Sequence, residues 1–230
     1  MGTEEEHTVN LQEKTNNLNA LQWNWSNCQA CALCQQRKNV VFGYGNPDAQ
    51  IMIVGEAPGA TEDEKGVPFV GNAGILLDQY LTQMSVQPDV QEEAAREAPD
   101  PGRIRQLLLR EYYFTNIVCC RPPENRDPTP KEMEACRARL LETIYLVDPM
   151  LIITVGGIAI SALVGKKIGI TAARGELFDI DVPGRIVSYK KPVLAVLHTS
   201  FLLRQNDFRQ PGGFGEKTFF DFLRAHHILD

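Results

Sequence analysis

The chain has 230 residues, of which 43% are hydrophobic and 23% charged, so its composition is that of a folded globular protein and excludes a disordered one. Its apolar runs are too short to span a membrane, and its acidic, polar start is not a signal peptide, so we expect a protein of the bacterial or archaeal cytoplasm with no membrane partner. The net charge of −6 argues against a nucleic-acid binder, but residues 1–22 carry −3 and residues 89–100 carry −4, which leaves the rest of the chain at +1.

The first part of the chain is predicted to hold a tail, a turn cluster and one strand. Residues 1–22 are expected to form a flexible acidic tail with room for a short helix, and residues 23–230 a single domain. The apolar run at 40–42 ends in a turn cluster, GYGNP. Residues 51–54 form a short apolar run typical of a buried parallel strand, and a helical pattern begins near Ala73.

The rest of the chain alternates strands and helices. Thr129, Pro130 and Glu132 predict a helix that starts with a capping box. The other predicted elements are an acidic surface insertion near 85–103, a helix at 104–110, a strand at 112–118, a strand at 150–155, a hairpin or irregular excursion at 169–187, a strand at 193–197 and a final helix at 217–225. This order predicts an α/β fold with a parallel sheet and helices on both faces.

The loop after the first strand, EAPGATEDEKGVPFVGN, is long for a strand-to-helix connection. It carries several acids, among them Glu56 and Glu62, and one aromatic residue, Phe69. It can be a connection with solvated acids. Ligands of open α/β sheets bind where such loops leave the carboxyl ends of the strands, so we favour a functional loop.

Six cysteines in a chain without a secretion signal favour metal binding over disulfides. Three follow the spacing C-x2-C-x2-C, and the others come much later: Cys28, Cys31, Cys34, Cys119, Cys120 and Cys136. Structural zinc, an iron–sulfur cluster and scattered reduced thiols all remain open. The three-cysteine motif of radical enzymes, C-x3-C-x2-C, is absent from the sequence.

Four motifs together resemble the family 4 uracil-DNA glycosylases, the iron–sulfur branch found in bacteria and archaea. They are the cysteine motif before VVFGYGNP, GEAPGATEDEKGVPFVGNAG, TNIVCCRPPENR with a later cysteine, and HTSFLLR. The resemblance implies a three-layer α/β/α fold with a central four-stranded parallel sheet, and removal of uracil from DNA to leave an abasic site. It also implies a [4Fe–4S] cluster on Cys28, Cys31, Cys120 and Cys136, with Cys34 and Cys119 outside the ligand set.

The same resemblance implies the residues around a flipped uracil. They are Glu56, Glu62, Asn125 and His198 as catalytic residues, and Ala57, Phe69 and Asn116 as substrate-binding residues. A flat pyrimidine suits an aromatic plate, and an asparagine amide complements its carbonyl and N–H groups. A histidine can stabilise the oxyanion of the departing base, and a carboxylate can orient water or face the sugar cation.

Residues for contact with DNA follow the histidine. Leu202 and Leu203 are expected to fill the gap that the flipped base leaves, and Arg204, with Arg121 and Arg126, to hold phosphates. The expected partner is uracil-containing DNA, single- or double-stranded, bound by a monomer.

Three features depart from the family pattern. Thr199 stands where proline is usual, Ala57 stands where glycine is usual, and the acidic insertion is longer than expected. A related branch traps DNA through a histidine after the second strand, but CCRPPENRDP contains none, which disfavours covalent trapping. Other readings of the chain are an iron–sulfur DNA-damage binder without catalysis and an iron–sulfur electron carrier, neither of which needs Glu56, Asn116 and His198.

Overall fold

The computed structural model describes residues 10–184, 187–205 and 210–229. Within them, six strands form one mixed sheet in the order β1-β3-β2-β4-β6-β5. The strands are β1 (Gly43–Gly45), β2 (Ile51–Gly55), β3 (Tyr112–Asn116), β4 (Leu151–Val155), β5 (Leu177–Val182) and β6 (Tyr189–Val196). The four central strands are parallel, as predicted, whereas β1 and β5 are antiparallel to their neighbours. The predicted number of four strands is therefore wrong, because two edge strands extend the sheet.

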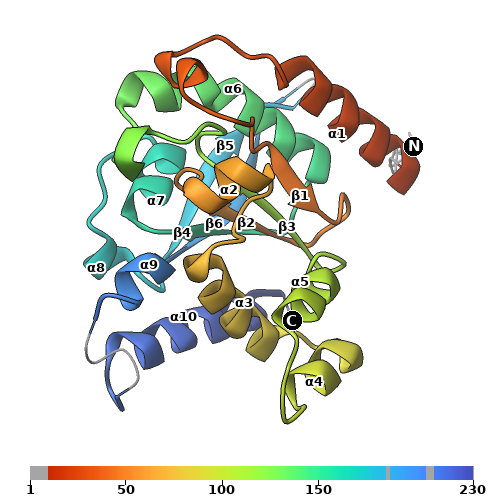
Figure 1. Cartoon of the computed structure of the whole chain (residues 1–230), viewed down its shortest axis with the longest axis vertical. Coiled ribbons are helices and arrows are strands. Elements are labelled where there is room, and N and C mark those ends of the chain that lie inside the picture. The colour runs from red at the N-terminus through yellow and green to blue at the C-terminus, as the bar shows by residue number, and fades with distance from the viewer. Residues whose placement is uncertain (1–9, 185–186, 206–209, 230) are drawn as a thin grey trace, which may run out of the picture.

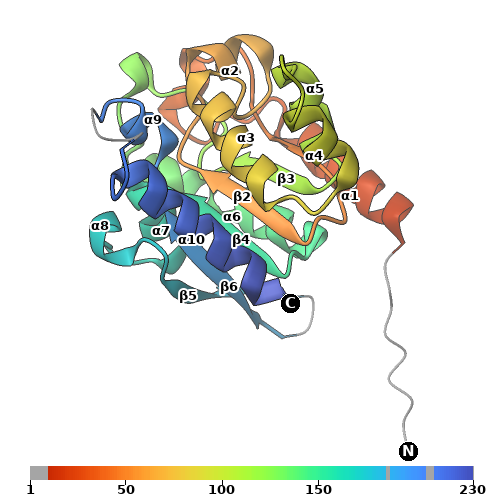
Figure 2. The same ribbon diagram turned by 90° about the horizontal axis from the view of Figure 1, so that it is seen from below.

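Helices cover both faces of the sheet, which confirms the three-layer architecture (Figures 1 and 2). On one face, α1, α6, α7 and α8 contribute to the core, and on the other α3, α4, α5, α9 and α10. The helices are α1 (Leu11–Trp25), η1 (Ala32–Gln35), α2 (Ala60–Lys65), α3 (Asn72–Met84), α4 (Pro88–Ala94), α5 (Pro101–Leu108), η2 (Pro123–Asn125), α6 (Pro130–Val147), α7 (Gly157–Val164), α8 (Ile170–Ala173), α9 (Thr199–Leu202) and α10 (Phe214–Leu229). No helix in these ranges combines the length and apolar character needed to cross a bilayer.

The central strands are apolar because both of their faces are covered. Every residue of β2, β3 and β4 is buried. Strands of this kind read as continuous apolar runs, which is why the sequence revealed them. The edge strand β5 alternates instead, with Ile180 and Val182 turned to the core and their neighbours exposed.

The N-terminal segment is more structured than predicted. Residues 11–22, expected to belong to a flexible tail, form most of α1, so the domain boundary predicted at residue 23 falls inside a helix. Lys14 anchors this helix, because its Nζ donates to the carbonyl of Val147 at 3.1 Å and pairs with Asp48 at 2.7 Å. The first nine residues of the predicted tail lie outside the described residues.

The acidic insertion forms two helices, α4 and α5, that pack against each other and against α3. Val90 of α4 and Leu108 of α5 are fully buried, and Leu107 of α5 is only 3% exposed. Asp100 caps α5 by accepting a hydrogen bond from the Gly102 N–H at 2.8 Å, so this helix begins before the predicted residue 104. The insertion is thus joined to the core of the domain, with its acidic side chains largely on the surface.

The capping box predicted for α6 is present. The Thr129 hydroxyl accepts from the Glu132 N–H, and the Glu132 carboxylate accepts from the Thr129 N–H. This reciprocal pair satisfies two donors at the helix start. It fixes the place where the chain leaves the loop after β3 and enters α6.

Candidate active site

Functional side chains meet at one edge of the sheet, where the parallel strands end. Glu56 follows β2, Asn116 ends β3, and His198 follows β6. Gly55 pairs in register with Asn116, and the Gly156 N–H after β4 donates to the Val196 carbonyl at 2.9 Å. These strand ends therefore lie side by side, the position at which open α/β sheets bind ligands. We call Glu56, Phe69, Asn116 and His198 the strand-edge site.

Phe69 and Asn116 meet over Gly55. A Cβ atom at Gly55 would lie 2.4 Å from Asn116 Oδ1 and 2.6 Å from Phe69 Cζ, so both side chains occupy the space that a side chain at 55 would fill. Phe69 is 8% exposed and Asn116 3%. An aromatic ring and a primary amide thus stand together at one strand end, which is the pair of groups that a flat, hydrogen-bonding base requires.

Phe69 sits in a strained loop between α2 and α3. Its φ of 56° is left-handed, which is unusual for a bulky residue. The Glu62 carboxylate holds the next two residues, because it accepts from the N–H groups of Val70 at 3.0 Å and Gly71 at 2.7 Å. Glu62, predicted to be catalytic, is therefore engaged in shaping the loop that carries Phe69.

Glu56, the other carboxylate of the motif that was predicted to be catalytic, has surroundings different from those of Glu62. It is partly buried, and no hydrogen bond to its carboxylate occurs within the described residues. Burial and, to a smaller extent, the charge of Asp127 from the loop after β3 together raise its pKa to about 7. A carboxylate with this pKa can exchange a proton near neutral pH, as a general base must.

His198 is held as a neutral imidazole. Its Nδ1 accepts a hydrogen bond from the Ser200 N–H at 3.1 Å and lies 2.7 Å from the Ser200 hydroxyl oxygen. Burial and, to a smaller extent, the positive charge of Arg204 together lower its pKa to about 4. Because Nδ1 accepts from a backbone donor, the single proton of the ring is on Nε2, where it is free to be donated.

Gly156 leaves the space that the His198 side chain occupies. Gly156 has a φ of 102°, and a Cβ there would lie 3.1 Å from Cδ2 and 3.2 Å from Cβ of the histidine. Both the backbone angle and the close approach favour glycine.

Other predicted residues lie farther from this arrangement. Asn125 is exposed on η2, and its Oδ1 accepts from Arg121 Nε at 2.8 Å. Arg126 forms two hydrogen bonds with the Glu132 carboxylate, at 2.7 and 2.9 Å. Ala57 is partly buried and packs against the core on the α6 side of the sheet. No contact joins Asn125 to Phe69 or Asn116 within the described residues.

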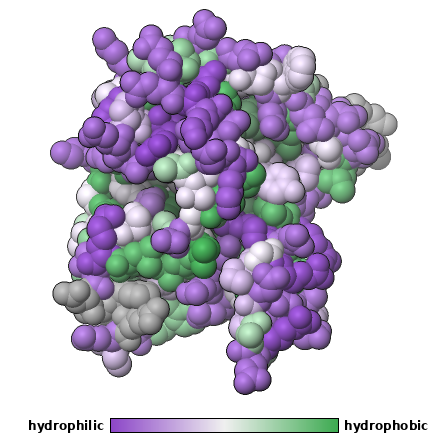
Figure 3. All heavy atoms as spheres, in the orientation of Figure 1, coloured by the Kyte–Doolittle hydropathy of each residue, from purple (hydrophilic) through white to green (hydrophobic). Residues whose placement is uncertain are grey.

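The two leucines after His198 differ in exposure. Leu202, which was expected to contact DNA, is fully buried in the core, whereas Leu203 is 47% exposed. Arg204 is exposed beside it. Figure 3 shows apolar atoms gathered over α9 and α10 on the face that also carries α2. Leu203 is therefore the apolar side chain of this pair that lies on the surface.

Cavities lie elsewhere in the molecule. One of about 250 Å³ is found between α6 and α7, and another of about 380 Å³ near the amino ends of β2 and β3. Neither is lined by Glu56, Phe69, Asn116 or His198.

Four cysteines from separate segments come near one another. Cys120 and Cys136 are buried in the same apolar cluster, and Cys31 packs against it. Burial raises the pKa of Cys120, a hydrogen bond from Arg37 at 3.3 Å opposes this, and the charges of Cys136 and Cys31 add to it, which gives a pKa of about 11. Burial also raises the pKa of Cys31, and the charges of Cys136 and Cys28 contribute. Within the described residues, no three His, Cys, Asp or Glu side chains are arranged to hold a metal ion.

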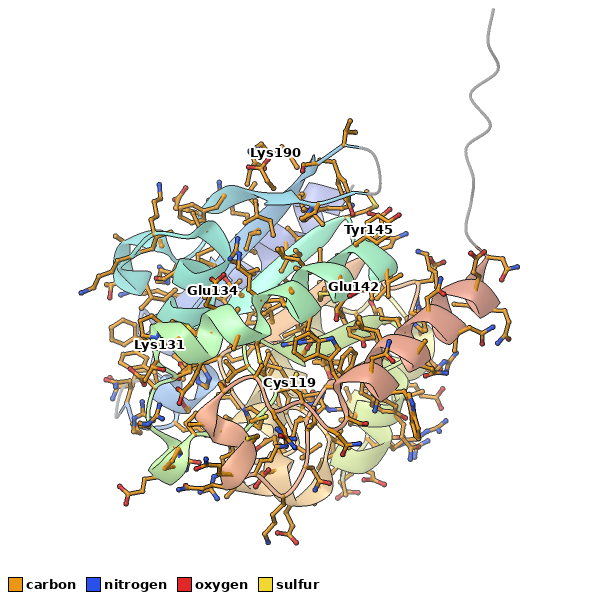
Figure 4. All side chains as sticks on the ribbon, turned by 90° about the horizontal axis from the view of Figure 1, so that it is seen from above. Cys119, Lys131, Glu134, Glu142, Tyr145 and Lys190 are labelled. Atoms are coloured by element: carbon orange, nitrogen blue, oxygen red, sulfur yellow. The ribbon has the colours of Figure 1, made fainter. Side chains whose placement is uncertain are left out.

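Cys119 points away from these four. Its thiol contacts the Phe42 carbonyl at 3.7 Å, and it packs with Leu21 and Phe42 in a separate apolar cluster. Figure 4 shows it where α1 and the loop after it meet α6. Burial raises its pKa to about 12. Adjacent cysteines in the sequence thus have different surroundings.

Comparison with known proteins identifies the family. A family model described as the uracil DNA glycosylase superfamily matches residues 42–220. The chain belongs to this superfamily. A type-4 uracil-DNA glycosylase of Thermotoga maritima is 39% identical over 186 residues, covering 80% of this chain and 82% of the relative. One from Archaeoglobus fulgidus is 32% identical over 211 residues, covering 85% and 94%. A type-5 uracil-DNA glycosylase of Thermus thermophilus is 35% identical over only 126 residues, covering 54% and 53%.

This uracil DNA glycosylase family member contains site residues that the motifs did not reveal. Ser200 fixes the imidazole, and Gly156 makes room for it. Arg139 is fully buried and donates to the carbonyl of Asn116 at 2.7 Å. The sequence does not reveal this partner, which only the fold brings beside Arg139.

We expect His198 to stay neutral across the physiological range. Nitrogen-15 NMR of the imidazole should show the Nε2–H tautomer with no titration between about pH 5 and about pH 8, because its pKa is lowered to about 4. His198→Gln identifies the signal by removing it. A titration midpoint near the ordinary value of about 6.5 would contradict the assignment.

Proposed function

We propose that this protein is a uracil-DNA glycosylase that flips uracil out of DNA, hydrolyses its N-glycosidic bond and leaves an abasic site. The observation that carries the proposal is the strand-edge site, in which an aromatic ring and an amide share the space over Gly55 beside a neutral histidine and a carboxylate with a raised pKa. The names of the relatives support the same activity. A base must leave the duplex to reach such a site.

Recognition of uracil is assigned to Asn116 with Phe69. The side-chain amide offers one donor and one acceptor, which match a uracil carbonyl and the neighbouring N–H. Cytosine presents the opposite pattern at both positions. Since the backbone of Asn116 is held by Arg139 and its side chain by close packing over Gly55, the amide can discriminate in a fixed orientation.

Bond cleavage is assigned to His198 and Glu56. As the glycosidic bond breaks, negative charge develops on the uracil oxygen, and the Nε2–H of His198 can donate to it. The sugar becomes cationic, and ionised Glu56 can stabilise it and take the proton of the attacking water. The water oxygen then bonds to the sugar carbon, and uracil leaves with the electron pair of the broken bond. Glu62 shapes the loop that positions Phe69.

Contacts with DNA are assigned to the segment after His198. Leu203 is exposed and apolar, so it can occupy the place of the flipped base, and Arg204 can bind a phosphate. The site needs only an extrahelical base, so we propose activity on both single- and double-stranded DNA. All the assigned residues come from one chain, which is consistent with action as a monomer.

A [4Fe–4S] cluster is assigned to Cys28, Cys31, Cys120 and Cys136. The fit rests on the donor set: Cys120 and Cys136 share one apolar cluster against which Cys31 packs, and Arg37 donates to Cys120 Sγ at 3.3 Å, whereas Cys119 packs in a separate apolar cluster. Cysteine thiolates are the ligands by which proteins hold such clusters. When bound, the cluster would tie the segment after α1 to the end of β3 and to α6; it supplies structure to this chain, and none of the steps above passes through it.

The proposed activity is tested with a uracil-containing oligonucleotide, followed by alkali cleavage at the abasic site. Asn116→Asp replaces the amide donor with an acceptor that faces the uracil carbonyl. A lost bidentate contact and an unpaired buried group each cost about 1–3 kcal/mol, so excision should fall by roughly 30- to 10,000-fold. Asn24→Asp, on the exposed side of α1, is the matched control and should excise normally. Near-normal excision and selectivity by Asn116→Asp would show that another residue reads the base.

The rate of excision should rise with pH through about 7. Glu56 acts in its ionised form and its pKa is about 7, so below that value the single-turnover rate should fall roughly tenfold per pH unit. Glu56→Gln should lose roughly a hundredfold or more and show a flat profile. Glu64→Gln, an exposed carboxylate on α2, serves as control and should keep both rate and profile. A wild-type profile that is flat between about pH 5 and about pH 8 would exclude this role for Glu56.

Iron content should separate the cysteines into two groups. Alanine at position 28, 31, 120 or 136 should abolish the brown colour and the iron of the purified protein and lower its stability, because the cluster then lacks a ligand. Cys34→Ala and Cys119→Ala should retain iron. Colourless wild-type protein with bound zinc would overturn the cluster, and loss of iron in either control would correct the ligand set.

A further inference from the structure

Arg105 lies behind the aromatic ring of the strand-edge site. It belongs to α5, the helix that begins inside the predicted acidic insertion. Its side chain is only 13% exposed and pairs with Asp78 of α3 at 2.9 Å. Its Nη2 donates to the backbone carbonyl of Phe69, and its Cζ lies 4.4 Å from the centroid of the Phe114 ring.

The Phe69 carbonyl needs such a partner. It is packed against the first turn of α3, since a Cβ at Gly74 would lie 1.9 Å from its oxygen. A bulky residue with a left-handed backbone persists only where its surroundings hold it there. Glu62 binds the two N–H groups that follow Phe69, and Arg105 binds the carbonyl. The peptide group between Phe69 and Val70 is thus held by two charged side chains, with Arg105 at its carbonyl and Glu62 at its N–H.

The ring of Phe69 is supported by the same group. Its centroid lies 6.0 Å from that of Phe114, at an angle of 58°. The Arg105 guanidinium stacks on Phe114, so one side chain contacts both the backbone of Phe69 and the ring on which Phe69 rests. The ring edge at Cζ is the part that meets Asn116 over Gly55.

An ion pair alone would not require this geometry. Asp78 compensates the buried charge of Arg105, as buried charges demand, and the pair joins α3 to α5. The hydrogen bond to Phe69 is an additional use of the same guanidinium, whose several donors can reach a carboxylate and a carbonyl at once. A lysine has one point charge and cannot keep both contacts together with the stack on Phe114.

We propose that Arg105 is a positioning residue for base binding, which holds the Phe69 ring at the distance from Asn116 that a flat pyrimidine requires. The proposal rests on the proposed uracil-binding function of the strand-edge site. It makes the α4–α5 insertion part of the substrate machinery. Because Arg105 acts through Phe69 and has no contact with Glu56 or His198, its loss should weaken binding of the base more than it slows bond cleavage.

The test uses a variant that leaves no buried charge without a partner. Arg105→Met alone would leave Asp78 buried and unpaired, so the informative protein is the double variant Arg105→Met/Asp78→Leu, which removes both charges together. Arg105→Lys keeps a positive charge to pair with Asp78 but lacks the planar guanidinium group. Arg103→Met is the matched control, because Arg103 is exposed on the same helix. Urea unfolding and iron content first establish that each purified holoprotein is folded.

Two measurements are then made on the folded proteins. Single-turnover excision at varied concentrations separates the half-saturation constant for uracil-containing oligonucleotide from the maximal rate. Fluorine-19 NMR of protein carrying 4-fluorophenylalanine in place of Phe69 reports the ring without any need for activity. In the double variant we expect the half-saturation constant to rise about ten- to a hundredfold, the range for loss of one base–aromatic contact, with the maximal rate within about threefold of wild type.

The fluorine signal should be single and sharp in wild type and in Arg103→Met, and broadened or divided in the double variant. Arg105→Lys should show the same changes to a smaller extent, and it decides the question if the double variant does not fold. Unaltered half-saturation and fluorine signal overturn the proposal, as does a fall in maximal rate with unaltered half-saturation. If wild type excises no uracil, the proposed function fails, and the fluorine signal still shows whether Arg105 positions the ring.

Discussion

The strand-edge site depends on the missing side chain of Gly55. The register of β2 and β3 places Gly55 directly beside Asn116. Any Cβ at this point would overlap the amide of Asn116 and the ring of Phe69. A glycine inside a buried strand sacrifices packing and conformational entropy, and here the vacated volume brings a donor–acceptor pair and a π-surface into contact. The contact between Asn116 and Phe69 is thus possible because β2 ends in a residue without a side chain.

Arg139 extends this arrangement into the opposite layer of helices. It is fully buried on α6 and donates to Thr115 Oγ1 at 2.9 Å and to the carbonyls of Asn116 and Ile117 at 2.7 and 3.1 Å. No carboxylate pairs with it among the residues that the structure describes. Three oxygen acceptors and the Phe42 ring, 5.7 Å from its Cζ, replace water around the charge. The end of β3 therefore cannot move without exposing or stranding a cation.

Sequence reasoning succeeded where one segment contains its own signal and failed where the signal lies in a distant partner. The central strands were predicted because burial on both faces leaves an unbroken apolar run. The edge strand β1 was missed because its residues, Gly43, Tyr44 and Gly45, read as a turn, and only pairing with β3 makes them a strand. The full length of α1 was not predicted for the same reason: a short helix was expected, and Lys14 finds its partners on other elements.

Functional residues divide in the same way. The motifs identified Phe69, Asn116 and His198, which the fold brings to one sheet edge. They did not separate Leu202 from Leu203, because the burial of one and the exposure of the other depend on how α9 packs against the second layer. Arg105 carried no motif signal, since its contacts with Phe69 and Asp78 join three elements that are separate in the sequence.

The anchoring of α1 has a consequence for how the protein is made. The carbonyl that Lys14 contacts lies 133 positions later in the chain, and α1 packs on α6, which also comes late. Contacts between such distant segments form slowly, because a long loop must close first. Synthesis produces Cys28 and Cys31 long before Cys120 and Cys136 exist, so the early thiols wait unpaired on the growing chain. The ribosome therefore makes α1 well before α6, the helix on which it packs.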